Sequence, residues 1–353
     1  MNDTLFSLHS WPRAIVHIDG DAFFTSCEEA IHPELRGKPI VTGAERGIIA
    51  CASYAAKAKG VKRGVSIYDA RRLCPGLIVL PSDYETYSLF SKRMFNIMRQ
   101  FTPQVEEYSI DEAFADITGL RRVHHASYET IVQRMKTAID GGLGITVSTG
   151  LSLTKVLAKI GSKHQKPSGM TAIAGRDIPR FLQHLPVEAV WGIGPATTAH
   201  LNKLGIKTAL EFAKLPEAMV RKHLIKPGIE IWQELRGESV LLVSTEEKKS
   251  YASISKMKTF APPSSNKEYL FAHLMRNLES ACMKARRYQL AARKIVAILR
   301  KQNFQDAGCE LKLNRPSSYP LELSTLLKGM FDDLLQEGGT LSGHGDLPSR
   351  PEA

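Results

Sequence analysis

The run from Ala14 to Phe24 most constrains what this chain can fold into. Its first residues are apolar and largely β-branched around His17, which is typical of a strand buried on both faces of a sheet. The run ends abruptly in Asp19-Gly20-Asp21 and two phenylalanines. A carboxylate that ends such a strand lies at the mouth of a sheet, where ligands usually bind. The residues alone are equally consistent with Asp19 closing the strand and Asp21 capping the next helix.

A second acidic motif follows about ninety residues later, where Asp111 and Glu112 stand amid apolar residues. Carboxylates are rarely buried unless they are paired or bind a metal ion. Hard oxygen ligands favour Mg²⁺, and two such ions about 3.5–4 Å apart can clamp the attacking and leaving oxygens of a phosphoryl transfer. The two motifs therefore predict a site for two magnesium ions.

The hexapeptide from Asp19 to Phe24, followed by Ser109-Ile110-Asp111-Glu112, resembles the Y-family DNA polymerases, closest to the bacterial polymerase IV branch. The resemblance extends from about residue 13 to about residue 335. It implies that Asp19 and Asp111 bind both ions and that Glu112 completes the site nearer the primer 3′-hydroxyl. It also implies that the carbonyl of Gly20 is a ligand of the nucleotide-bound ion. Many relatives carry a larger residue at Gly20, but this contact is made by the backbone.

The resemblance implies a multidomain fold of the α+β and α/β classes, arranged as a polymerase right hand. Strands that alternate with helices favour an α/β palm on independent grounds. A change to short helices and tight turns near residue 178 predicts a small helical domain. The expected domains are a palm (1–24 and 80–177), small fingers (25–79), a thumb with a helix-hairpin-helix (178–244), a little finger (250–337) and a poorly ordered tail (338–353).

Hydrophobic periodicity predicts the elements of these domains. Predicted strands cover 48–54, 145–150, 253–260, 294–300 and 309–313, and predicted helices cover 55–59, 126–140, 153–160, 267–287 and 321–335.

Several aromatic and basic residues are candidates for nucleotide binding. Phe23 and Phe24 are most simply core aromatics, but the resemblance implies that Phe24 lies beneath the sugar and excludes a 2′-hydroxyl. It likewise implies that Tyr54, Lys57 and Lys166 contact the triphosphate. Lys57 replaces the arginine usual in relatives, so that a bidentate fork becomes a point charge.

The residues leave plainer alternatives open for the two lysines. Lys57 alone reads as a surface lysine, and Lys166 as compensation of a helix dipole. Lys155 and Lys159 on the same helix are left without an assigned role.

The net charge of +11 is concentrated in one part of the chain. The segment 248–315 holds fifteen Lys and Arg but four Asp and Glu, so the rest of the chain is neutral overall. Such concentration predicts a nucleic-acid-binding surface. The turn around Gly192 and Gly194 resembles a helix-hairpin-helix that binds a DNA phosphate through its backbone. The DNA-binding candidates are Gly192, Gly194, Lys256, Lys258, Arg293 and Lys294.

The sequence also predicts partners and location. We expect primer–template DNA and a dNTP as partners and a monomeric protein; a sliding clamp is a further possible partner, although no clamp-binding peptide is recognisable. The five cysteines form no C-x-x-C pair, and no apolar run approaches the length of a membrane span. Without a recognisable leader, a cytoplasmic protein is expected.

These observations predict an error-prone translesion DNA polymerase without proofreading. Two other functions remain open at this point. The first is a non-catalytic DNA-binding protein with an idle polymerase site, and the second is a nuclease that uses the same metal ions.

Overall fold

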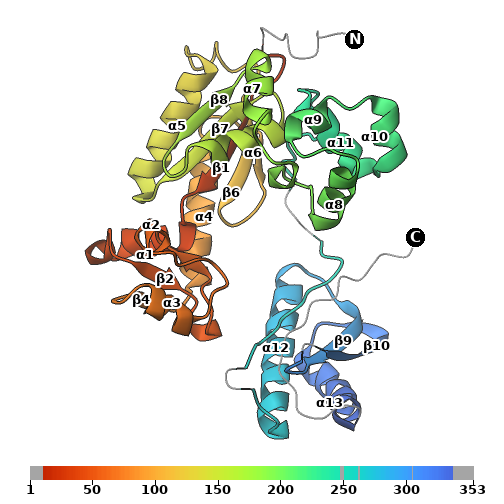
Figure 1. Ribbon diagram of the computed structural model, residues 1–353. Helices are drawn as coiled ribbons and strands as arrows, with labels where there is room; N and C mark the ends of the chain where they lie inside the picture. The colour runs from red at the N-terminus through yellow and green to blue at the C-terminus, as the bar shows by residue number, and fades with distance from the viewer. Residues whose placement is uncertain (1–10, 247–249, 261–262, 304, 337–353) are drawn as a thin grey trace. The chain divides into compact units, whose positions relative to one another are not determined.

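The computed structural model divides the chain into two compact units, Met1–Glu246 and Glu247–Ala353 (Figure 1). It describes residues 11–246, 250–260, 263–303 and 305–336. The predicted tail, 338–353, lies outside the described residues. Among those described, no helix combines the length and apolar character needed to cross a bilayer.

The N-terminal unit is built on a five-stranded sheet in the order β5-β6-β1-β7-β8. Its central strand β1 is buried along its whole length, as its β-branched sequence predicts. It pairs antiparallel with both β6 and β7, whereas β7 and β8 run parallel. The strands are β1 (Ile15–Gly20), β5 (Val105–Glu107), β6 (Glu112–Asp116), β7 (Val147–Ser152) and β8 (Met170–Ile173).

The two faces of this sheet are covered by different helices. Val16 and Ile18 pack in one core with α4 (Tyr84–Arg99) and α5 (Tyr128–Leu143). Residues Ile15 and His17 point to the opposite face, toward α6 (Lys155–His164). Because side chains alternate along a strand, Asp19 also faces the α6 side of the sheet.

Two glycines allow α6 to lie directly on β7. A Cβ atom on Gly150 would stand 1.9 Å from the carbonyl oxygen of Ala158 and 2.4 Å from the amide nitrogen of Ser162. A Cβ atom on Gly161 would stand 3.2 Å from the Cα of Gly150. The helix thus approaches the strand at a distance that only glycine permits.

A small sheet of three strands, in the order β3-β2-β4, forms a separate part of the N-terminal unit. The strand predicted at 48–54 is much shorter than expected. Ile48 forms only an isolated bridge with Ser66, while the following helix begins at Tyr54 because Ser53 caps it. The elements here are α1 (Phe23–Ile31), β2 (Ile40–Thr42), β3 (Cys51–Ala52), α2 (Tyr54–Ala58), α3 (Ile67–Leu73) and β4 (Ile78–Leu80).

A cluster of short helices begins near residue 178, as predicted. Its core includes Leu201, Phe212 and Leu235, all fully buried. The buried carboxylate of Glu234 accepts a hydrogen bond from the amide of Val156 at the start of α6, and so ties this cluster to the sheet. The helices are α7 (Ile178–Leu182), α8 (Pro195–Lys203), α9 (Ala209–Ala213), α10 (Glu217–His223) and α11 (Lys226–Leu235).

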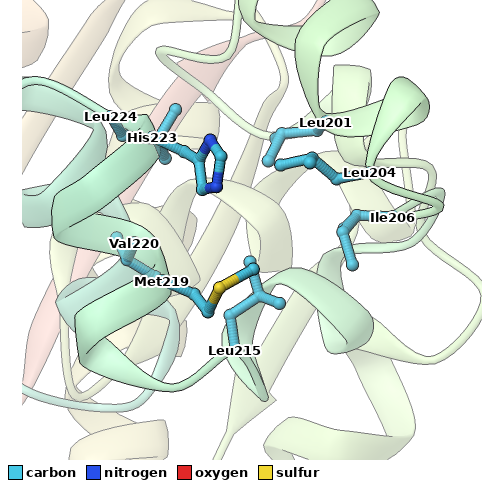
Figure 2. Close-up of a pocket in the computed structure, with 8 residues that line it drawn as sticks. All are labelled: Leu201, Leu204, Ile206, Leu215, Met219, Val220, His223 and Leu224. Carbon is cyan, nitrogen blue, oxygen red and sulfur yellow. The ribbon is translucent and has the colours of Figure 1, made fainter.

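A small cavity of about 70 Å³ lies within this helical cluster. Figure 2 shows Met219 and His223 reaching into it from α10, opposite Leu201 and Leu204. Apart from the imidazole, its lining side chains are apolar, so the cavity offers no set of oxygen ligands.

The C-terminal unit contains two helices and, in its described residues, a two-stranded antiparallel sheet. Both predicted helices are confirmed, and so are the two later strands. The strand predicted at 253–260 is wrong, because that described segment pairs with no neighbouring strand and has neither helix nor strand structure. The elements are α12 (Lys267–Arg287), β9 (Ala292–Arg300), β10 (Asp306–Ser317) and α13 (Pro320–Gln336).

The close contact between α6 and β7 predicts that Gly150→Ala destabilises the N-terminal unit by at least about 2 kcal/mol, since the new methyl group meets backbone atoms. The matched control is Gly141→Ala in α5, where a Cβ atom would meet nothing within 4 Å. Unfolding in urea can be followed by tryptophan fluorescence, because Trp11, Trp191 and Trp232 all lie in this unit. Equal stability of the two variants would contradict the assigned contact.

Candidate active site

The predicted acidic residues converge at one end of the five-stranded sheet. Asp19 on β1 lies directly opposite Glu112 on β6 in the antiparallel ladder. The amide of Gly20 donates to the carbonyl oxygen of Asp111 at 2.8 Å, which fixes the turn before β6 beside the end of β1. The structure therefore brings all three predicted carboxylate residues together.

The Asp19 carboxyl group is buried among other charges. Burial raises its pKa to about 6, an effect that Lys166 opposes. The charges of Glu112 and Asp111 raise this pKa further. The three acids thus interact electrostatically, as expected when like charges share a site.

Two lysines from the α6 side pair with these carboxylates. Lys166 donates to an oxygen of Asp19, and Nζ of Lys159 lies 2.6 Å from Oε2 of Glu112. Burial acts to raise the pKa of Glu112, but His17 and Lys159 outweigh it and lower the pKa to about 2. Glu112 is consequently an anion at neutral pH.

Asp111 is held differently from the other two acids. Ser109 donates its hydroxyl to Oδ1 of Asp111 at 2.6 Å. In the part of the chain that the structure describes, no lysine or arginine forms an ion pair with Asp111. Asp111 thus differs from Asp19 and Glu112, each of which pairs with a lysine.

Asp21 does not cap a helix, so that prediction is wrong. The N-cap of α1 is Ala22, and no side chain caps this helix. Asp21 is buried and accepts hydrogen bonds at 2.7 Å from the hydroxyl of Ser148 and from the amide of Ser168. The side chain of Asp21 thus faces Ser148 on β7. Its backbone amide donates to the carbonyl oxygen of Thr146, the residue before β7. Asp21 thereby fixes the loop that carries Lys166.

The donor set suits a hard divalent cation, although no ready-made cluster is present. Among the described residues, no three His, Cys, Asp or Glu side chains are arranged as a metal-binding group. Instead, Asp19 pairs with Lys166 and Glu112 pairs with Lys159, so that lysine ammonium groups supply the positive charge beside these acids. Carboxylate oxygens are the ligands that Mg²⁺ prefers. The residues fit such an ion provided that Asp19 exchanges its contact with Lys166.

Phe23 and Phe24 begin α1 beside this site. Phe23 is buried, and a Cβ atom on Gly20 would stand 2.6 Å from Cδ2 of its ring, so glycine allows the ring to lie against the strand end. Phe24 is half-buried and stacks on Tyr87 with ring centroids 4.5 Å apart. Tyr84 packs edge-on against the same ring at 5.4 Å. Phe24 is therefore held in one orientation from two sides.

Tyr54 and Lys57 lie on α2, and Tyr54 reaches the acidic site. The Tyr54 hydroxyl is 3.5 Å from Oδ1 of Asp21, at the limit of a hydrogen bond. Burial and the charges of Asp21 and Asp19 raise the pKa of this hydroxyl. Lys57 lies over the Tyr54 ring, 4.3 Å from its centroid. The structure thus brings Tyr54 to the acidic residues, and Lys57 contacts the site only through the Tyr54 ring.

Gly192 and Gly194 form the turn before α8. Gly192 has a positive φ of 89°, and a Cβ atom there would stand 2.4 Å from Cδ1 of Ile231. Gly194 is the N-cap of α8, with Pro195 next and no side-chain cap. A Cβ atom on Gly194 would meet nothing within 4 Å, so its backbone is open to a ligand.

The remaining DNA-binding candidates lie in the C-terminal unit. Arg293 and Lys294 are exposed on β9, where Lys294 pairs with Glu310 at 3.0 Å. Lys256 and Lys258 are exposed in the segment that is not a strand. The structure places both pairs on the surface of this unit.

Sequence reasoning gave no role to several residues around Glu112. Lys159 binds this carboxylate, and His17 lies 3.9 Å from it. The His17 ring is bonded to Ser162 at 2.7 Å, and burial lowers its pKa to about 4. The sequence does contain a pattern that could have indicated these contacts. Lys155 and Lys159 lie one turn apart on an otherwise buried helix, and buried lysines require carboxylate partners.

Family models match most of the chain. Residues 18–163 match the impB/mucB/samB family, and residues 251–345 match the C-terminal domain of that family. Residues 176–206 match the IMS family HHH motif, which confirms the predicted helix-hairpin-helix.

Curated relatives agree with these models. A protein named DNA polymerase IV from Clostridium kluyveri is 37% identical over 297 residues, covering 83% of this chain and 74% of its own. A namesake from Desulfatibacillum aliphaticivorans is 32% identical over 323 residues, covering 91% and 81%. A solved structure of a Y-family DNA polymerase chimera superposes with a TM-score of 0.79 at 23% identity, covering 94% of this chain and 96% of that one. This last likeness shows the fold.

Proposed function

Because the chain belongs to the Y-family of DNA polymerases, in the DNA polymerase IV group, we propose that it is a template-directed, error-prone translesion DNA polymerase. It adds dNTPs to a primer 3′-hydroxyl, releases pyrophosphate and does not proofread. The observation that carries this proposal is the convergence of Asp19, Asp111 and Glu112 at one end of the five-stranded sheet.

The parts of the chain take the roles of a polymerase right hand in this proposal. The five-stranded sheet with its helices is the palm (1–24 and 80–177), and the small sheet belongs to the fingers (25–79). The short helices form the thumb (178–244), and the C-terminal unit is the little finger (250–337). The small sheet and the C-terminal unit each have a hydrophobic core of their own, which supports this division. The palm and the thumb share a core, which α6 joins to the short helices.

The family as a whole uses divalent metal ions. In this chain, Asp19, Asp111, Glu112 and the Gly20 carbonyl would hold two Mg²⁺. When bound, the ions supply activation of the primer hydroxyl and neutralise charge on the phosphates. As a ligand, Asp19 would give up its contact with Lys166, whose ammonium group would then be available to another anion. The protein's own groups mainly position the reactants.

Tyr54, Lys57 and Lys166 are proposed to bind the incoming triphosphate, with Phe23 and Phe24 beside its sugar. Their proximity to the acids supports this grouping, because Tyr54 reaches Asp21 and Lys166 reaches Asp19. A lysine ammonium has no preferred plane, so Lys57 and Lys166 act as point charges on phosphate oxygens.

Primer–template DNA is proposed to lie along the thumb turn and the little finger. Backbone amides at Gly192 and Gly194 contact a phosphate, and Lys256, Lys258, Arg293 and Lys294 contact others. Phosphate contacts position a protein on DNA but do not read its sequence. We propose that the protein acts as a monomer, and nothing in the chain identifies a sliding-clamp contact.

The proposed catalytic acids predict that Asp111→Asn reduces primer extension by at least about 10³-fold, because an amide cannot neutralise a bound cation. Affinity for primer–template DNA should stay within about two-fold of wild type, since DNA is held elsewhere. The rate of extension is measured with a labelled primer, Mg²⁺ and dNTPs. The affinity for primer–template DNA is measured by fluorescence anisotropy. Glu107→Ala, which removes an exposed carboxylate of the same sheet, is the matched control.

Three outcomes of this experiment contradict the proposal. Wild-type protein that binds DNA without extending the primer is a non-catalytic DNA-binding protein. Degradation of the primer without dNTPs identifies a nuclease. Collapse of DNA binding in the Asp111→Asn variant removes the assigned role of this residue.

The fixed ring of Phe24 predicts that Phe24→Ala lowers discrimination against ribonucleotides by at least about ten-fold, because the space left by the ring then admits the 2′-hydroxyl. Single-nucleotide incorporation with matched dNTP and rNTP measures the ratio of kcat/KM values. Tyr68→Ala, which removes an exposed ring of α3 and leaves the contacts of Phe24 intact, serves as the control. Unchanged sugar discrimination in the Phe24 variant would refute the assignment.

A further inference from the structure

Lys159 is held in an aromatic box beside the acidic site. It lies in the middle of α6, and its side chain is 7% exposed. Its Nζ is 2.6 Å from Oε2 of Glu112, 4.6 Å from the ring centroid of Tyr108 and 5.3 Å from that of Trp191. A buried ammonium gains from a carboxylate and from aromatic faces at these distances. Lys159 is thus fixed from three sides.

The two aromatic walls of the box also fix each other. The indole Nε1 of Trp191 donates to the Tyr108 hydroxyl at 3.1 Å. Their rings meet edge to face with centroids 5.3 Å apart, and Trp191 stacks on Phe114 at 5.6 Å. These contacts keep both rings from rotating away from Lys159.

Lys166, the other lysine at the acids, is held much more loosely. It lies beyond the end of α6, and its side chain is 26% exposed. It can therefore leave Asp19 without disturbing a packed helix. Lys159 cannot do so, which makes it a permanent partner of Glu112.

Trp191 belongs to the helical cluster and not to the sheet. Trp191 directly precedes Gly192, and the residue after Gly192, Ile193, is buried in the core of the helical cluster. The turn proposed to contact DNA therefore supplies one wall of the box around Lys159. A side chain from the thumb thus reaches, through one lysine, a carboxylate of the palm.

We propose that Trp191 is a positioning residue that acts on Glu112 through Lys159. Together with Tyr108, Trp191 keeps the Lys159 ammonium group in contact with Oε2 of Glu112, and this contact holds the Glu112 carboxylate in one orientation. A glutamate has three side-chain torsions, so a fixed partner lowers the entropy lost when it becomes a metal ligand. This inference rests on the proposed function, because it concerns a proposed ligand of the metal ions.

The chain provides a matched control in Lys155, one turn earlier on α6. Its Nζ lies 2.7 Å from both oxygens of Glu106, 4.7 Å from the Phe114 ring centroid and 6.0 Å from that of Trp191. Its side chain is also 7% exposed. Lys155→Met therefore disturbs similar packing next to the same indole but leaves Glu112 untouched.

The test measures Mn²⁺ binding to the full-length protein by electron paramagnetic resonance, which does not depend on turnover. Trp191→Leu should weaken Mn²⁺ binding about ten-fold, the lower end of the effect of losing a residue that orients a metal ligand. Trp191→Phe keeps a ring over Lys159 and should stay within two-fold of wild type, as should Lys155→Met. Tyr108→Leu removes the other wall and should act like Trp191→Leu, which keeps the test informative if one variant fails to fold.

A double-mutant cycle decides whether the effect passes through Lys159. In a Lys159→Met background, Trp191→Leu should change Mn²⁺ affinity less than two-fold, since the ammonium to be positioned is gone. An equal loss in both backgrounds would overturn the proposal, and so would unchanged affinity in the single Trp191→Leu variant. Failure of wild type to extend a primer would instead refute the proposed function, so the two failures are distinguishable.

Discussion

The site depends on the repulsion between carboxylates gathered at the end of a buried strand. Three acids in a partly desolvated place remain ionised only when positive charge lies among them. Lys159 and Lys166 provide it from a single helix and the loop that follows. The pKa values of Asp19 and Glu112 shift in opposite directions, because burial dominates at Asp19, whereas interactions with His17 and Lys159 outweigh burial at Glu112.

The close packing of α6 on the sheet makes these ion pairs possible. Without side chains at Gly150 and Gly161, the helix axis comes near enough for lysines to reach the strand ends. The same helix receives the Glu234 carboxylate at its N-terminus, where a negative charge is favoured. Packing of one helix thus joins the sheet, the acidic site and the helical cluster.

The sequence predicted the central strand, the three acids, both helices of the C-terminal unit and α2, α5 and α6 of the N-terminal unit, because each has a strong local pattern. Continuous β-branched residues indicate a buried strand, and regular apolar spacing indicates α12 and α13. Local patterns do not predict contacts between residues that are far apart in the sequence. The hydrogen bonds of Asp21 to Ser148 and Ser168 join residues more than a hundred positions apart, and no local pattern distinguishes them from a helix cap. Alternation at 253–260 failed for a related reason, since a strand also needs a neighbour.

The central claim is that Asp19, Asp111 and Glu112 bind catalytic divalent ions. Anomalous diffraction from crystals grown with Mn²⁺, primer–template DNA and a non-hydrolysable dNTP analogue tests it most directly. Anomalous peaks should lie within coordination distance, about 2.0–2.3 Å, of oxygens from all three carboxylates, with Lys166 displaced from Asp19. Peaks confined to other parts of the protein, with the contact between Lys166 and Asp19 intact, would contradict the claim.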